Sequence, residues 1–122
     1  MQAMMKPFHI LVTDTNLHVR NLLKRELQQD GHTIYMAKNK KEVHDHIHGT
    51  NKLDIIILDP EVPDLLDQSL LNQIQERVPR VKIIIHTFIE FFNDLGLDEN
   101  IHFVEKSAIS IGPLKKEIAT GS

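Results

Sequence analysis

The sequence of 122 residues contains no cysteine. Disulfide bonds, thiolate zinc sites and a cysteine nucleophile are therefore excluded, which fits a reducing compartment. The sequence also lacks a large excess of one charge, because 14 basic and 17 acidic side chains leave a formal net charge of −3. Nucleic-acid binding needs a concentrated basic face, so we expect no nucleic-acid partner.

Long apolar runs are missing as well. The first apolar run, residues 8–13, is too short for the hydrophobic part of a secretory leader or for a membrane span. We therefore expect a cytoplasmic protein with no membrane partner. No internal repeat, low-complexity stretch or linker interrupts the chain, and its length suits one ordinary domain. We expect a single domain over 1–122, with its core at about 8–119 and no output domain.

Short apolar segments alternate with helical patterns. Five segments have the apolar, β-branched character of buried strands, and they cover 8–13, 32–36, 54–58, 81–86 and 101–104. Apolar residues between and after them recur at helical spacing over 16–30, 39–48, 65–78, 88–97 and 113–119. Because parallel strands need crossover connections, this alternation predicts an α/β fold with a doubly wound, five-stranded parallel sheet.

The first predicted helix illustrates how the pattern assigns faces and ends. Its apolar residues Val19, Leu22, Leu23 and Leu27 are expected on one buried face. Gly31 stands just past the last of them, where a glycine commonly caps a helix. The helix over 16–30 is therefore expected to pack on the sheet and to end before Gly31.

Four polar residues stand where predicted strands end. Asp14 follows the first strand, Asp59 the third, Thr87 ends the fourth, and Lys106 lies just beyond the fifth. In doubly wound folds the functional groups gather at the carboxyl ends of the strands. This set suits phosphoryl transfer to a carboxylate, with Asp59 as nucleophile, Asp14 helping to hold a divalent metal, and the other two binding phosphoryl oxygens.

The stretches that carry these residues resemble the receiver domains of bacterial response regulators. They are ILVTD (10–14), DIIILDPEVP (54–63), VKIIIHT (81–87) and IHFVEK (101–106). The resemblance extends from about Phe8 to Ala119. It implies the flavodoxin-like receiver fold of five strand–helix units, and a signalling domain rather than an enzyme.

The resemblance also implies roles for individual residues. Asp59 would accept a phosphoryl group from a histidine kinase or phosphotransfer protein, with Thr87 and Lys106 contacting the phosphate. Mg²⁺ would be held by Asp14, Asp59 and the backbone carbonyl of Glu61. The phosphorylation state would be signalled to a protein partner, or within a homodimer, through the face around 88–119. The segment 88–97 on this face is more apolar than a short surface helix requires.

Three positions depart from the receiver pattern. Thr15 stands where receivers usually carry a second acid, so we expect Mg²⁺ affinity to be weakened or lost. Phe88 replaces a small residue and is expected to cover the pocket. Ser107 replaces a proline that usually follows the lysine through a cis bond; without proline that bond costs roughly 3 kcal/mol. The loop after Lys106 is therefore either trans, with altered lysine placement, or strained. In addition, the aromatic before the lysine is Phe103, which has no hydroxyl.

These departures favour one alternative, a pseudo-receiver that binds proteins independently of phosphorylation. A hydrolase with Asp14 as nucleophile is less favoured, because Asn16 stands where a second acid is needed. The pair His44 and His48 has the helical spacing that can clamp a metal, but no third ligand is evident. A solvated helix face explains that pair more simply.

Overall fold

The computed structural model describes residues 7–62, 68–88, 101–107 and 109–120. Its five strands form one parallel sheet in the order β2-β1-β3-β4-β5. The strands are β1 His9–Thr13, β2 Thr33–Ala37, β3 Ile55–Leu58, β4 Lys82–Thr87 and β5 Ile101–Glu105. The helices are α1 Leu17–Gln29, α2 Lys40–Ile47, α3 Gln68–Arg77 and α4 Ile111–Ala119. The predicted α/β fold with a five-stranded parallel sheet is confirmed.

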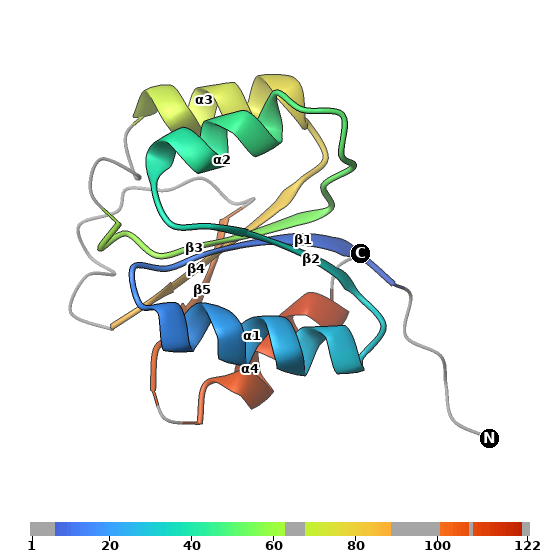
Figure 1. Cartoon of the computed structure of the whole chain (residues 1–122), viewed down its shortest axis with the longest axis vertical. Helices are drawn as coiled ribbons and strands as arrows, with labels where there is room; N and C mark the ends of the chain where they lie inside the picture. Colours follow the sequence, from blue (N-terminus) through green and yellow to red (C-terminus); the bar gives the residue numbers. More distant parts are fainter. Residues whose placement is uncertain (1–6, 63–67, 89–100, 108, 121–122) are drawn as a thin grey trace.

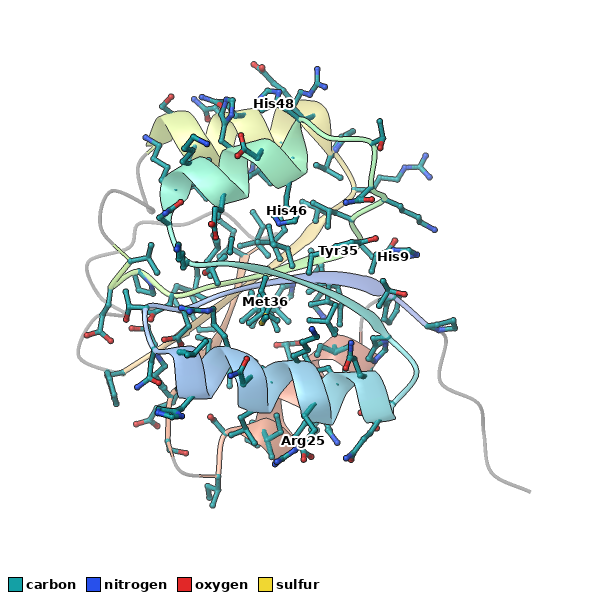
Figure 2. All side chains as sticks on the ribbon, in the orientation of Figure 1. His9, Arg25, Tyr35, Met36, His46 and His48 are labelled. Carbon is teal, nitrogen blue, oxygen red and sulfur yellow. The ribbon has the colours of Figure 1, made fainter. Side chains whose placement is uncertain are left out.

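The helices cover both faces of the sheet, with α2 and α3 on one face and α1 and α4 on the other (Figure 1). Alternate residues of each strand therefore enter different cores. Leu11 packs with the α2 and α3 residues, whereas Ile10 and Val12 pack with those of α1 and α4. On β2, Tyr35 and Met36 likewise point to opposite faces (Figure 2). Burial on both faces explains why β1, β3 and β4 are almost continuously apolar.

The ends of α1 follow from its flanking residues. The side chain of Asn16 accepts hydrogen bonds from the backbone N–H groups of His18 and Val19, so it caps the first turn. At the other end Gly31 has a φ of 93°, and its N–H donates to the carbonyl of Gln28. This is the left-handed cap predicted for Gly31, a conformation that a side chain at this position would disfavour.

One residue of the predicted buried face of α1 is on the outside. Leu23 and Leu27 are buried and Val19 packs against the same core, but Leu22 is 43% exposed. The expectation for Leu22 was wrong because each helical residue turns the chain by about 100°, which carries Leu22 well away from Leu23. Leu22 is three residues after Val19, but this helical spacing did not place its side chain against the sheet.

The remaining boundaries lie close to those predicted, except that α4 begins at Ile111 rather than at 113. The predicted helix 88–97 lies outside the described residues after Phe88, and so does the predicted start of α3 at 65–67. In the described part of the chain, no helix has the length and apolar character needed to cross a membrane.

Candidate functional site

The four polar residues predicted at the strand ends do lie at the carboxyl edge of the sheet. Asp14 directly follows β1, Asp59 follows β3, Thr87 is the last residue of β4, and Lys106 follows β5. Asp14, Asp59 and Thr87 are all buried. Since β1, β3, β4 and β5 are adjacent in the sheet, the parallel register brings residues from distant parts of the sequence to one edge.

Lys106 joins the two carboxylates. Its Nζ lies 2.8 Å from Oδ2 of Asp14 and 3.1 Å from Oδ2 of Asp59. The other oxygen of each acid accepts a backbone hydrogen bond two residues along, from Asn16 to Asp14 and from Glu61 to Asp59, both at 2.9 Å. Each carboxylate is therefore held between a turn and the same ammonium group.

Thr13 is a further structural member of this edge. Its buried hydroxyl donates to the carbonyl of Ile57 and accepts from the N–H of Asp59, both at 3.1 Å. The side chain thus fixes the end of β3, where Asp59 leaves the sheet, against the end of β1. We had assigned no role to Thr13. A hydroxyl in an otherwise apolar strand was the only sign of it in the sequence.

Burial and charge oppose each other in setting the protonation of the site. Burial raises the pKa of Asp59, and the nearby charge of Asp14 adds to this, against the Glu61 N–H and the Lys106 ammonium. Burial lowers the pKa of Lys106, but the hydrogen bond and the charges supplied by Asp14 and Asp59 outweigh it, so the net shift is upward. The ammonium is therefore strongly held, whereas the Asp59 carboxylate bears a net cost for being ionised.

Thr87 has an unused hydroxyl. Its Oγ1 is buried and makes no hydrogen bond to any residue that the structure describes. Its backbone carbonyl accepts from the N–H of Lys106 at 2.7 Å, which extends the pairing of β4 with β5 beyond the strand itself. A buried hydroxyl without a partner is rare and costly, so this group suits a ligand that brings an acceptor oxygen.

Phe88 lies beside the lysine. Its ring centroid is 5.8 Å from Nζ of Lys106, within range of a cation–π contact, and the residue is 44% exposed. The ring therefore screens the ammonium on one side while remaining in contact with solvent. The sequence predicts that Phe88 covers the pocket. Among the described residues, Phe88 does contact Lys106, the cation of the pocket.

The bond between Lys106 and Ser107 is trans, since the described residues contain no cis peptide bond. Of the two alternatives for this loop, the trans form is present. Lys106 nevertheless reaches both Asp14 and Asp59. The placement of the lysine is thus achieved without the cis proline of the receiver pattern.

The donor set has the character that a hard divalent cation takes. Two buried carboxylates, Asp14 and Asp59, direct one oxygen each at a single cationic group. Mg²⁺ binds through one or two carboxylates and keeps several waters, so these residues fit it. Thr15 is exposed and adds no carboxylate. Within the described ranges, no three His, Cys, Asp or Glu side chains form a metal-binding group.

Three histidines lie on α2 or at its C-terminal cap, namely His44, His46 and His48. His44 and His48 have ring centroids 4.1 Å apart, and neither belongs to a three-ligand group among the residues described. His46 contacts the carbonyl of Met36 at 3.2 Å and lies between α2 and the sheet (Figure 2). At the start of β1, Nδ1 of His9 lies 3.1 Å from the hydroxyl of Tyr35 on β2. The His46 contact joins α2 to β2, and the contact between His9 and Tyr35 joins β1 to β2.

The family model described as the response regulator receiver domain matches residues 10–94, which is more than half of the chain. No curated protein matches the chain.

Solved structures agree with the family match. The response regulator TrrA from Thermotoga maritima, in complex with Mg²⁺ and BeF, is 28% identical with a TM-score of 0.75, covering 91% of this chain and 96% of that one. A complex of the histidine kinase ThkA with TrrA matches at 30% identity and a TM-score of 0.72, covering 91% and 95%. A receiver domain protein from Clostridium thermocellum, at 23% identity, 91% and 90% coverage and a TM-score of 0.76, shows the same fold. With its parallel sheet, its acidic edge and these matches, the chain belongs to the response regulator receiver domain family.

Proposed function

We propose that this receiver domain acts in the cytoplasm and accepts a phosphoryl group on Asp59 from a histidine kinase or a phosphotransfer protein. The observation that carries the proposal is the convergence of Asp14, Asp59 and Lys106 beside the unpartnered hydroxyl of Thr87. The complex of TrrA with a histidine kinase supports a kinase as the partner of a related receiver. The activity is signalling by a modified state rather than turnover of a substrate.

The chemistry follows from the positions of the side chains. An oxygen of Asp59 forms a bond to phosphorus while the bond from phosphorus to the donor histidine nitrogen breaks, and that nitrogen keeps the electron pair. Lys106 then pairs with the phosphoryl oxygens, and the hydroxyl of Thr87 donates to one of them. Both groups are already at the edge of the sheet, so little reorganisation is needed.

Charge balance makes a divalent cation necessary. Asp14 and Asp59 carry two negative charges against the single positive charge of Lys106, and a phosphoryl group adds more negative charge. Mg²⁺ would be held by Asp14, Asp59 and the carbonyl of Glu61, and it would neutralise charge that develops on the phosphoryl oxygens. Because Thr15 offers no carboxylate, we propose that this affinity is weak.

The output surface is proposed to be the face around 88–119, used for a homodimer or a protein partner. Among the described residues, a shallow groove of about 410 Å³ runs between β5 and α4. It is lined by apolar and charged side chains together, including Phe103, Pro113 and Lys116. Such a mixed lining suits a protein surface, and its position next to Lys106 in the chain relates it to the phosphorylation site.

Intact-mass analysis after incubation with acetyl phosphate and Mg²⁺ tests the proposal. The wild type is expected to gain one labile phosphoryl group, in a metal-dependent reaction that Asp59→Asn abolishes. Asp45→Asn is the matched control, because Asp45 is an exposed acid of α2 that pairs with Lys41. An equal gain in wild type and Asp59→Asn would exclude Asp59 as the acceptor.

The pseudo-receiver is the second candidate. Thr15 favours it because it offers no carboxylate to a metal, and Phe88 favours it because its ring lies beside Lys106. Calorimetric titration with Mg²⁺ separates the two candidates. We expect a receiver to give a saturable heat of Mg²⁺ binding, whereas a pseudo-receiver gives no heat of binding and no phosphoryl gain.

A further inference from the structure

Two buried polar side chains lie next to the site without touching its carboxylates. His86 is 3% exposed and directly precedes Thr87 on β4, and Ser110 is 6% exposed and directly precedes α4. His86 Nε2 lies 2.9 Å from Ser110 Oγ. Because strand residues alternate, His86 faces the same layer as Ile84, which packs with α1 and α4. The contact therefore links the end of β4 to the start of α4.

The hydrogen bonds of Ser110 assign a direction to this contact. Its hydroxyl donates to the carbonyl of Ser107 at 3.0 Å, and a hydroxyl has only one proton to donate. His86 must therefore carry its proton on Nε2 and donate to Ser110 Oγ. The result is a chain of donors from the His86 ring through the Ser110 hydroxyl to the Ser107 carbonyl.

Ser107 is held by both its polar groups. Its carbonyl also accepts the backbone N–H of Ser110 at 3.2 Å, and its hydroxyl accepts the N–H of Ile109 at 3.3 Å. Ser107 is the residue immediately after Lys106. The turn that carries the lysine out of β5 is thus fixed at its far side to β4, through Ser110 and His86.

Ser110 gives up an ordinary role to make these contacts. It occupies the N-cap position of α4, where a serine hydroxyl normally accepts an N–H of the first turn. In this helix the Ser110 side chain makes no capping hydrogen bond. The hydroxyl is directed to His86 and Ser107 instead, so its position serves the loop and not the helix end.

We propose that His86 and Ser110 are positioning residues that hold Lys106 between Asp14 and Asp59. The backbone of Lys106 is fixed on one side by its N–H bond to the Thr87 carbonyl at 2.7 Å, and on the other by the Ser107 contacts. Both anchors belong to the end of β4. This double attachment takes the place of the proline that usually follows the lysine in receivers, and its effect on phosphoryl transfer rests on the proposed function.

The test uses Ser110→Ala in the whole chain, with Thr120→Ala as the matched control. Thr120→Ala removes a hydroxyl at the opposite end of α4, one that contacts only Glu117 in the described residues. The first readout is the NMR signal of the Lys106 ammonium in the unphosphorylated protein, followed by its exchange with water and its pKa. The second is the rate of phosphoryl gain from acetyl phosphate with Mg²⁺.

We expect Ser110→Ala to speed the exchange of the Lys106 ammonium, to lower its pKa and to slow phosphoryl gain on the order of tenfold. Thr120→Ala is expected to match the wild type. His86→Leu should have the same three effects as Ser110→Ala. His86→Gln keeps a side-chain N–H donor and should behave more like the wild type. The His86 pair decides the matter if Ser110→Ala does not fold.

An unchanged Lys106 signal in folded Ser110→Ala or His86→Leu overturns the inference, whatever happens to the melting temperature. A wild type that gains no phosphoryl group overturns the proposed function instead. In that case the Lys106 signal still decides whether His86 and Ser110 position the lysine, because it is measured without phosphorylation.

Discussion

Lys106 Nζ lies 2.8 Å from Asp14 Oδ2, so the lysine is paired with the acid that follows β1 as well as with Asp59. The lysine side chain is only 12% exposed, and that of Asp14 is 1% exposed. Solvent therefore screens this pair little. The ammonium lies between two carboxylates that could also bind a divalent cation. Removing the ammonium should therefore change both the stability and the function of the protein.

Replacing Lys106 by methionine should strongly destabilise the fold. Removing one partner of a buried ion pair leaves uncompensated charge, which costs about 3–5 kcal/mol. Lys41→Met is the control, because its pair with Asp45 is exposed on both sides and such pairs contribute about 0–1 kcal/mol. Urea denaturation measures both. Adding Asp14→Asn to Lys106→Met should recover part of the loss, and no recovery would contradict the pairing.

Asp59→Asn should raise the melting temperature at neutral pH. Burial raises the pKa of Asp59, so the folded protein holds this proton more tightly than the unfolded chain does. Its contribution to stability is therefore present at low pH and is lost as the pH rises through the raised pKa. A neutral amide of the same shape avoids that loss. Thermal unfolding at pH 7 and at pH 4 should show the gain mainly at pH 7, and a gain confined to pH 4 would contradict the sign.

His86 should make the protein less stable in mild acid. Burial and the charge of Lys106 lower the pKa of His86 from 6.5 to about 4. The unfolded chain takes up this proton below about 6.5, so stability falls as the pH decreases from there to about 4. At about 1.4 kcal/mol for each pH unit, the loss reaches about 3 kcal/mol.

Comparison of the wild type with His86→Gln isolates this effect. Burial also lowers the pKa of His32, which contributes a loss of the same sign in both proteins. The expected result is a shallower decline of stability with acid in His86→Gln, measured by urea denaturation across pH 4–7. Parallel curves for the two proteins would show that His86 does not titrate in this way.

Thr15→Asp should strengthen Mg²⁺ binding on the order of tenfold, since it adds a third carboxylate beside Asp14 and Asp59. His18→Asp is the matched control, because it makes the same change to the net charge at an exposed position of α1. Isothermal titration measures the affinity of each variant. If both variants bind the ion equally well, the effect is one of overall charge and not of a third ligand.

Phe88→Ala should open the pocket and shorten the lifetime of the phosphorylated state. The ring lies 5.8 Å from Lys106 Nζ, and its removal admits water to the ammonium side of the site. Ile109→Ala is the control, since Ile109 is a more exposed apolar residue, at 78%, in the loop before α4. Loss of the phosphoryl mass over time should be several-fold faster in Phe88→Ala alone. Equal lifetimes in all three proteins would argue against a covering role for Phe88.

The strands and the polar residues at their ends were predictable because both depend on local pattern. Continuous apolar runs indicated burial on both faces, and the polar residue that ended each run indicated the functional edge. The outward position of Leu22 was not predictable in the same way, because two apolar residues adjacent on a helix cannot both face one sheet. Periodicity shows which residues of α1 could face the sheet, and packing against β1 and β2 decides which of them do.

The contacts that organise the site join residues far apart in sequence. Thr13 contacts Asp59 across 46 positions, and His86 contacts Ser110 across 24. No spacing rule links such residues, since each pair depends on how two strands or a strand and a helix are placed. This is why the acids and the lysine were anticipated, whereas Thr13, His86 and Ser110 were not.

Residue order alone was enough for the α/β class, the parallel sheet and the edge at which Asp14, Asp59, Thr87 and Lys106 gather. Those features follow from hydrophobic periodicity and from the need of parallel strands for crossovers. The tertiary structure alone decided that Lys106 joins both acids, that Thr87 has no partner among the described residues, and that Ser107 is tied back to β4. These contacts form or fail when the distances between buried groups change by a few tenths of an ångström, and only the packed fold sets those distances.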